Sequence, residues 1–249
     1  MSALPFANNP FLYINGLEIS NNATTPNTKL DIAAGQCRDS TDVYQISTSS
    51  ALTINAATNG LNGLDTGSLA ASTVYAVHLV ADPVDGNTTG AMISTSYTAP
   101  VLPFGYSAFR LIGYIVTDSS VHFLPGYWVG NNNARMFMYD APQATAITAG
   151  ADTSYTAITL TALVPTKDNT PVWIYSDLTP GAAGRALYLQ PTGATGAAVI
   201  ITGQVSTVHV TANSLVLAKL SSSVPKISYK VSNGGDAAAI KVAGYQFYI

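Results

Sequence analysis

LNGLDTGSLAASTVYAVHLV, residues 61–80, is the stretch around which the N-terminal half of this chain is expected to fold. Residues 73–80 are rich in β-branched and aromatic side chains and contain neither glycine nor proline, a pattern that predicts a strand entering the core. Glycines at positions 60, 63 and 67, with Asp65 between them, are typical of a tight loop, because glycine tolerates positive φ. The stretch therefore predicts a loop that leads into a central β-strand.

Composition favours β structure throughout the chain. The 249 residues are 47% hydrophobic and only 9% charged, with a net charge of −3, which is not the composition of a disordered protein. Glu18 is the only glutamate, whereas Val, Ile, Thr and Tyr recur, and these residues prefer strands to helices. A chain of this length has room for two ordinary domains.

We predict an all-β protein of two parts, an N-terminal antiparallel β-rich module followed by a C-terminal β-sandwich of jelly-roll type. Residues 1–10 are expected to form an extended arm that is either disordered or docked on a neighbouring subunit. The module takes residues 11–140 and the sandwich takes residues 145–249. The segment between them contains Pro142, and the charge balance changes there: the first 140 residues carry four basic and nine acidic side chains, the rest six and four.

Within the module, residues 91–97 should return as the hairpin partner of the central strand, and residues 43–47 should pair with residues 52–56. The proline-containing tract at 98–106 cannot be a central strand, because proline offers no amide hydrogen to a ladder. Residues 109–117 should resume a strand. In the sandwich, short strands separated by turn residues are expected at 155–163, 172–175, 186–189, 198–202, 207–211, 215–220, 226–231 and 240–249.

The residue types that catalysis or metal binding requires are sparse and scattered. Cys37 is the only cysteine, so neither an intrachain disulfide nor a thiolate cage is possible, and a small buried hydrophobe is its expected role. His78, His122 and His209 lack the close spacing of metal ligands, although in a threefold assembly one histidine near the axis would become three. Nearly all aspartates lie beside turn-forming residues, where they cap backbone amides. We predict no catalytic residue, no metal site and no cofactor.

The patterns expected for nucleic-acid or membrane partners are also missing. Neither half has the dense basic patch that nucleic-acid binding requires. No run approaches the roughly 20 apolar residues that span a bilayer, and the first residues lack the features of a secretory signal. We therefore expect no nucleic-acid partner and no membrane insertion.

Two tryptophan-containing pairs are candidates for an aromatic platform on which sugar rings stack. Tyr127 and Trp128 lie between two glycines and are expected in an exposed loop, which makes them the candidate surface or receptor contact. Even there, packing between domains or subunits is the favoured role. Trp173, close to Tyr175, falls in an apolar strand and is expected in the core.

Three segments of the chain resemble a module found in tailed-phage and prophage virion proteins. They are LDIAAGQCRDSTDVY at residues 30–44, the GLDTGS loop before the central strand, and PVLPFGYSAFRLIGYIVTDSS at residues 100–120. They occur in the order of that module, and the resemblance covers about residues 11–125. In the last segment Phe109-Arg110 stands where the module has two arginines. The closing SNGGDAAAIKVAGYQFYI resembles the last strand of small β-sandwich domains on phage appendages.

The resemblance implies a non-enzymatic structural protein of the virion, assembled in the cytoplasm of a bacterial host. By analogy it is a homotrimer in which one part docks on other virion proteins, of the tail or the capsid, and the other part projects. A tail-fibre or receptor-binding appendage is the main expectation, with a host surface glycan as a candidate partner. The alternative is a head decoration or head-fibre protein on the capsid lattice, and a polysaccharide-binding or -degrading tailspike is the third hypothesis.

Overall fold

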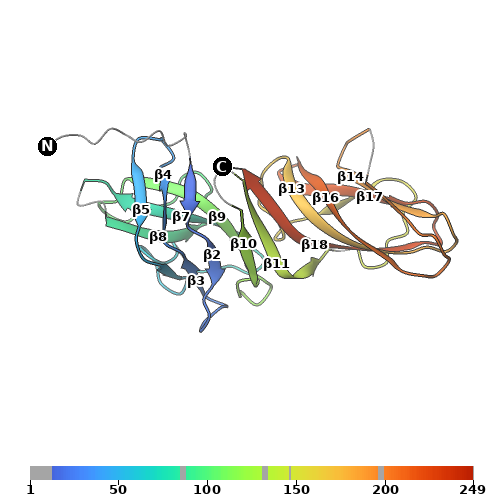
Figure 1. The fold of residues 1–249 in the computed structure, drawn as a ribbon, viewed down its shortest axis with the longest axis horizontal. Helices are drawn as coiled ribbons and strands as arrows, with labels where there is room; N and C mark the ends of the chain where they lie inside the picture. The colour runs from blue at the N-terminus through green and yellow to red at the C-terminus, as the bar shows by residue number, and fades with distance from the viewer. Residues whose placement is uncertain (1–12, 85–87, 131–133, 146, 196–198, 249) are drawn as a thin grey trace.

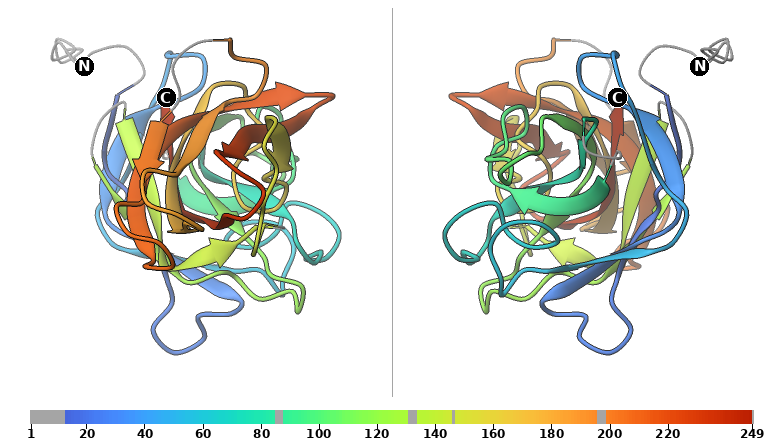
Figure 2. Two further views of the ribbon diagram at one scale, coloured as in Figure 1. Left: turned by 90° about the vertical axis from the view of Figure 1, so that its right-hand side faces the viewer. Right: turned by 90° about the vertical axis from the view of Figure 1, so that its left-hand side faces the viewer.

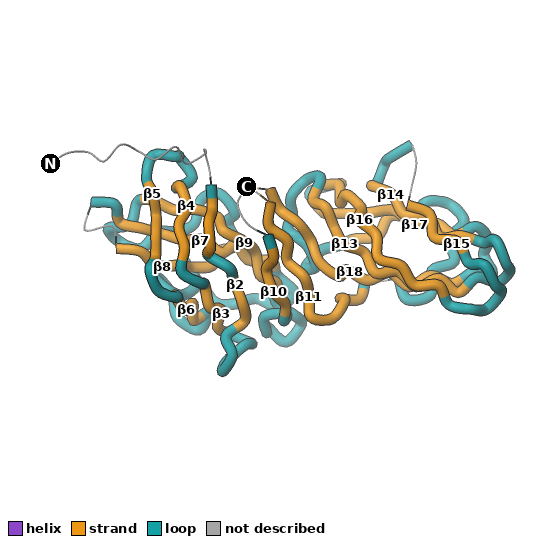
Figure 3. The backbone as a smooth tube through the Cα atoms, in the orientation of Figure 1, coloured by secondary structure: helices purple, strands orange, loops and turns teal. Residues whose placement is uncertain are grey.

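The structure, a computed structural model, describes residues 13–84, 88–130, 134–145, 147–195 and 199–248. The molecule is elongated, with the N-terminal half at one end and the C-terminal half at the other (Figure 1). All helical or strand structure in the described residues is β-strand, so the predicted all-β class is confirmed (Figure 3). The predicted arm at residues 1–10 lies outside the described residues.

The predicted central strand is β7 (Val74–Asp82), which lies between β8 (Thr88–Ser94) and β9 (Ala108–Val116) in a three-stranded sheet. Both neighbours run antiparallel to β7, so the predicted hairpin and the returning strand are confirmed. Residues 75–81 are buried without interruption. Burial on both faces explains why nearly every position of this strand is apolar. The proline-containing tract before β9 holds no strand, as expected.

The first six strands are divided between two sheets. One sheet contains β1 (Ile14–Gly16), β4 (Gly35–Arg38) and β5 (Gln45–Thr48), whereas β2 (Ile19–Asn21), β3 (Lys29–Ile32) and β6 (Leu52–Asn55) belong to a larger sheet. The predicted pairing of residues 43–47 with residues 52–56 is therefore wrong. Residues 49–51 carry the chain from one sheet to the other instead of reversing it, so β5 pairs with β4 and β6 pairs with β3.

The larger sheet has twelve strands and extends through both halves. Its order is β15-β14-β17-β16-β13-β18-β11-β10-β2-β3-β6, and β12 pairs with β17. The remaining strands are β10 (Gly126–Val129), β11 (Ala134–Ala144), β12 (Thr156–Thr159), β13 (Thr170–Thr179), β14 (Ala186–Pro191), β15 (Val199–Thr202), β16 (Val210–Ser221), β17 (Val224–Val231) and β18 (Ala237–Tyr248).

In the C-terminal half this sheet folds over at the hairpin between β16 and β17, so that the strands form two layers around a core (Figure 2). This architecture is the predicted β-sandwich. Residues 207–211 and 215–220 were predicted as separate strands, but residues 210–211 and 215–220 belong to the single long strand β16, and residues 207–209 precede it. Asn213 and Ser214 are residue types common in turns, which is why the sequence predicts a break there. In the structure the alternation of buried and exposed side chains continues through both residues.

The two halves share one core. Residues 140–144, predicted to link them, form the end of β11, with a register shift in its pairing with β18. Tyr114 of β9 lies 5.2 Å from Phe247 of β18, measured between ring centroids. The Tyr139 hydroxyl donates a hydrogen bond of 2.7 Å to the carbonyl of Leu163. The segment between the halves is therefore paired strand and not a free linker.

Candidate functional site

Five neighbouring strands of the larger sheet, β10, β11, β18, β13 and β16, present an inner row of side chains in register. This row consists of Trp128, Phe137, Tyr245, Val172 and Val216. All five side chains are buried. The Trp128 ring centroid lies 5.4 Å from that of Phe137 and 6.1 Å from that of Tyr245, in the tilted and edge-to-face arrangements that aromatic rings prefer. The inner row is core.

Trp128 is therefore a core residue, and its predicted place in an exposed loop is wrong. β10 is paired on both sides, and the Trp128 side chain is only 6% exposed. Gly113 of β9 makes room for the indole, since a Cβ at that position would lie 2.9 Å from the ring. Side chains alternate along a strand, so Tyr127, which is 50% exposed, faces solvent instead.

The opposite face of the same five strands carries an outer row. Its members are Tyr127, Met138, Gly244, Trp173 and Leu215, again paired strand by strand. Trp173 was expected in the core, but it is only partly buried here, because its neighbours Val172 and Ile174 take the inward positions of β13. The run Val-Trp-Ile-Tyr is apolar on both faces, so its alternation does not reveal which face is the core.

A groove of about 430 Å³ lies between Met138 and Trp173 of the outer row. Trp173 and Tyr175 of β13 form one wall, and Met136 and Met138 of β11 form the other. The walls are about 10 Å apart, because β18 lies between their strands. On β18, Gly244 leaves room for the Met138 side chain. A Cβ at this position would lie 2.7 Å from the Met138 sulfur and still closer to the backbone carbonyl oxygen of Phe137.

The groove offers mainly apolar contacts. Besides its walls it is lined by Ala243, Pro142, Tyr139 and the amide side chain of Asn213. The indole N–H of Trp173 is buried and has no hydrogen-bond partner among the described residues. Flexible methionine side chains adapt to the shape of an apolar occupant. The lining therefore suits an apolar side chain better than a ligand rich in hydrogen-bonding groups.

Exposed apolar side chains flank the groove on both sides. Tyr127 lies on the β10 side, and Leu215 and Leu217, which are 45% and 40% exposed, lie on the β16 side. We call the surface formed by Tyr127, Met136, Met138, Trp173, Leu215 and Leu217 the apolar strip.

Charged side chains surround the apolar strip but do not interrupt it. Beyond one end, His209 Nδ1 lies 2.9 Å from Asp177 Oδ1 at the surface. Lys241, the strand partner of Tyr175, is exposed beside the groove, and Lys219 is exposed farther along β16. The surface thus has an apolar centre and a polar rim.

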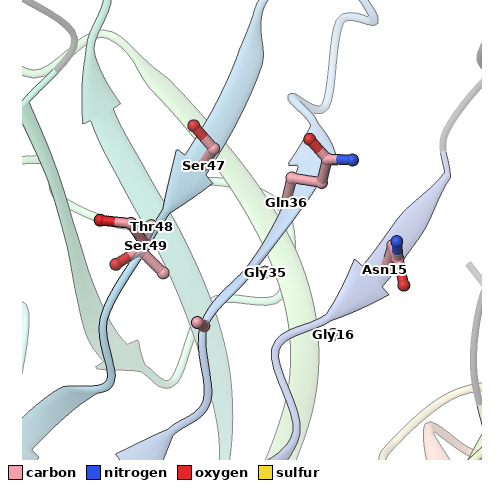
Figure 4. A pocket seen from close by; sticks show the side chains of 8 residues that line it. Asn15, Gly16, Gly35, Gln36, Ser47, Thr48 and Ser49 are labelled. Carbon is pink, nitrogen blue, oxygen red and sulfur yellow. The ribbon is translucent and has the colours of Figure 1, made fainter.

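A second hollow, of about 360 Å³, lies on the three-stranded sheet of β1, β4 and β5. Asn15, Gln36 and Ser47 lie side by side across the three strands, next to Gly16 and Gly35 (Figure 4). Its polar groups are neutral amides and hydroxyls. They offer hydrogen bonds to a polar partner, but they include no carboxylate, histidine or thiol for acid–base or nucleophilic chemistry.

The three histidines lie in three separate places. His78 is fully buried, with Nε2 3.0 Å from the carbonyl oxygen of Ser96, and burial lowers its pKa. His122 and His209 are at the surface, each beside an aspartate. Within the described ranges, no three His, Cys, Asp or Glu side chains gather closely enough to hold a metal ion. None of the described segments forms an apolar helix of membrane-spanning length.

Cys37 and Asp39 have the structural roles expected of them. The Cys37 thiol is buried, and burial raises its pKa to about 12. The Asp39 carboxylate accepts hydrogen bonds from the backbone amides of Val43 and Tyr44, at 2.8 and 2.7 Å, and so caps a turn. Neither group is a chemically activated side chain.

Arg135 is a residue that sequence reasoning missed. Its side chain is 1% exposed, and its guanidinium donates to the carbonyls of Leu17 and Ile112 at 3.0 and 2.8 Å, and also to the carbonyl of Gly16. Burial lowers the pKa of this guanidinium. The contacts tie β11 to two other parts of the N-terminal half. The sequence did contain one sign that Arg135 is buried. It precedes Phe137 by two residues, and side chains two residues apart in a strand lie on the same face, which in β11 is the inward face.

No protein-family model matches the chain, and no curated protein sequence matches it. A solved structure similar to part of it is the carbohydrate-binding module CBM6cm-2 from Cellvibrio mixtus lichenase 5A, in complex with cellotriose. The identity is 12%, the match covers 44% of this chain and 76% of the module, and the TM-score is 0.25. Similarity at this level does not bear on the function of the chain.

Proposed function

We propose that this chain is a non-enzymatic structural protein of a tailed-phage virion, a subunit of a tail fibre or receptor-binding appendage. The observation that supports this most is that the three segments carrying the resemblance pack into one body. The Ser40 amide, in the first segment, donates a hydrogen bond of 2.8 Å to the carbonyl of Phe109, in the third. The strand after the GLDTGS loop, β7, pairs along its length with β9, which lies in the third segment.

The end of the N-terminal half offers a surface through which the chain could dock on the particle. Val84 and Phe104 are exposed there, Phe104 completely. The loop that carries Phe104 is held beside the end of β7 by a hydrogen bond of 3.1 Å from the Ser107 amide to the Ala81 carbonyl. Large exposed apolar side chains are candidate contacts for a protein partner. In the proposed mechanism this end binds the particle and the C-terminal half projects.

The location of the chain on the particle tests the proposal directly. Particles from the phage or prophage that encodes the chain would be purified, analysed by mass spectrometry for the chain, and imaged with a gold label on a tag after the last residue. We expect the chain in the particles and the label at the tail. A label spread over the capsid lattice would support head decoration and overturn the tail placement, and absence of the chain from purified particles would overturn the virion role.

A matched pair of variants tests the docking surface. Phe104→Asp should lower the amount of chain incorporated into particles at least about tenfold, since a carboxylate in an apolar contact removes roughly the free energy of one buried aromatic side chain, more than 1.4 kcal/mol. Val208→Asp, at an exposed valine of the C-terminal half, should leave incorporation unchanged. Equal incorporation of both variants would argue against docking through the Phe104 loop.

A further inference from the structure

The apolar strip has the composition of the centre of a protein interface. Its six side chains are two aromatic residues, two methionines and two leucines, and the nearest charged side chains are Lys241 on β18 and Asp140, two residues after Met138. Interface centres are enriched in aromatic residues and methionine and are depleted of charge. Among the described residues nothing covers Tyr127, Leu215 or Leu217, which remain 40 to 50% exposed. We propose that the apolar strip binds a second copy of this chain.

The shape of the strip favours a copy of itself as the occupant. The groove between Trp173 and Met138 is a hole, and Tyr127 on one side and the two leucines on the other are knobs. Two identical surfaces of this kind place the knobs of each in the groove of the other. In a symmetric dimer every such contact occurs twice, and in a closed ring each copy gives its knobs to one neighbour and its groove to the next.

The size of the face is close to what a specific interface needs. The five strands from β10 to β16 span four strand spacings, about 19 Å, and β13 with its ten residues is about 33 Å long. The face is therefore at most roughly 600 Å², because β10 has only four residues, against about 800 Å² per partner in an interface of standard size. Side chains that stand above the sheet add to this area, so the face reaches the lower end of the size range of specific interfaces.

The charge of the chain also fits self-association. With a net charge of −3 over 249 residues, two copies repel each other only weakly. A charged partner would find no complementary charge within the strip. A saccharide would find aromatic rings but few hydrogen-bonding groups, because Asn213 and Tyr175 are the main polar side chains of the groove. A second copy of the chain presents the same apolar side chains to the strip, and this inference does not depend on the proposed virion role.

Sedimentation equilibrium and native mass spectrometry of the full chain test the proposal, with a double variant and a matched control. Leu215→Lys with Leu217→Lys places two cations on one side of the groove without touching the core, because both leucines face outward. We expect the unaltered chain to assemble and the double variant to bind itself at least about 100-fold more weakly, which corresponds to about 2.7 kcal/mol. Ile200→Lys, at an exposed isoleucine of β15 outside the strip, should assemble like the unaltered chain.

Tyr127→Lys, on the other side of the groove, should weaken assembly as well, and its far-ultraviolet circular dichroism should match that of the unaltered chain. Trp173 gives an independent signal, because the only other tryptophan, Trp128, is buried in the core, so a blue shift of emission with rising concentration reports burial of Trp173. A chain that stays monomeric at about 100 µM would overturn the proposal. Assembly that survives all three lysine substitutions would also overturn it. Monomers whose Trp173 emission responds to oligosaccharides would assign the groove to saccharides instead.

Discussion

Replacing each of the two tryptophans separately tests the assignment of the two faces of the sheet. Trp128→Ala removes a side chain that lies within ring-contact distance of Phe137, Tyr245 and Phe247 and leaves a cavity between the two halves. Trp173→Ala removes a partly buried side chain from the wall of an open groove. The structure therefore predicts a large loss of stability for the first variant and a small one for the second.

The magnitudes follow from burial. Truncation of a buried tryptophan to alanine costs about 3 to 5 kcal/mol, because the transfer free energy of the ring is lost and the cavity does not close completely. In a chain of 249 residues each kcal/mol lowers Tm by about 2 to 4 °C, so Trp128→Ala should lower Tm by about 6 to 20 °C. At the partly exposed position, Trp173→Ala should cost about 1 kcal/mol or less.

Urea unfolding followed by far-ultraviolet circular dichroism measures both variants without relying on tryptophan emission. The measurement should be made at a low protein concentration, where association through the apolar strip does not contribute to stability. Trp128→Phe is the milder companion and should cost less than the alanine variant, since it keeps most of the ring contacts. Equal losses for the two alanine variants, or a larger loss for Trp173→Ala, would refute the assignment of β10 and β13 side chains to inner and outer faces.

Three further predictions concern the interior. Gly244→Ala should lower the free energy of unfolding by about 1 to 3 kcal/mol, because its Cβ would clash with the backbone carbonyl of Phe137 and lie 2.7 Å from the Met138 sulfur. Gly234→Ala, with no atom closer than 3.9 Å, should change it little. Arg135→Met should cost about 3 kcal/mol, since buried carbonyls lose their charged donor. Burial raises the pKa of Cys37 from 9.0 to about 12, so between these pH values only the unfolded state loses the thiol proton, and stability should fall by up to about 1.4 kcal/mol per pH unit.

Each of these has a measurement that decides it. Urea midpoints of the two glycine variants, compared side by side, should differ, and coincident midpoints would contradict the close packing over β18. For Arg135→Met, a midpoint like that of the unaltered chain would mean that the carbonyls find other donors. For Cys37, a Cys37→Ser variant should lose less free energy of unfolding than the unaltered chain as the pH rises above 9. Rapid reaction of the native thiol with a disulfide reagent at pH 8 would contradict the burial of Cys37.

Much of the fold is visible in the sequence, for a local reason. β7 and β9 were predicted because strand-forming residues act within a few residues and no proline interrupts either segment. The turn-capping role of Asp39 was predicted on the same basis. Pairing was predicted less well. β5 and β6 follow one another in the chain, yet they belong to different sheets, because the neighbours of a strand depend on where the whole chain has already placed β3 and β4.

The candidate site shows where local information ends. The sequence by itself determined that Trp173 and Tyr175, predicted in one strand, face the same way, because side chains in a strand alternate with a period of two. Tyr127 and Trp128 were expected in a loop, and only their place in β10 makes them face opposite ways. The sequence did not determine which face is the core, since both strands are apolar on both faces. Only the tertiary structure decided that Trp128 lies inside and Trp173 outside: Phe247, Tyr245 and Gly113 arrive from distant parts of the chain and enclose one face of the sheet, and the other face stays open.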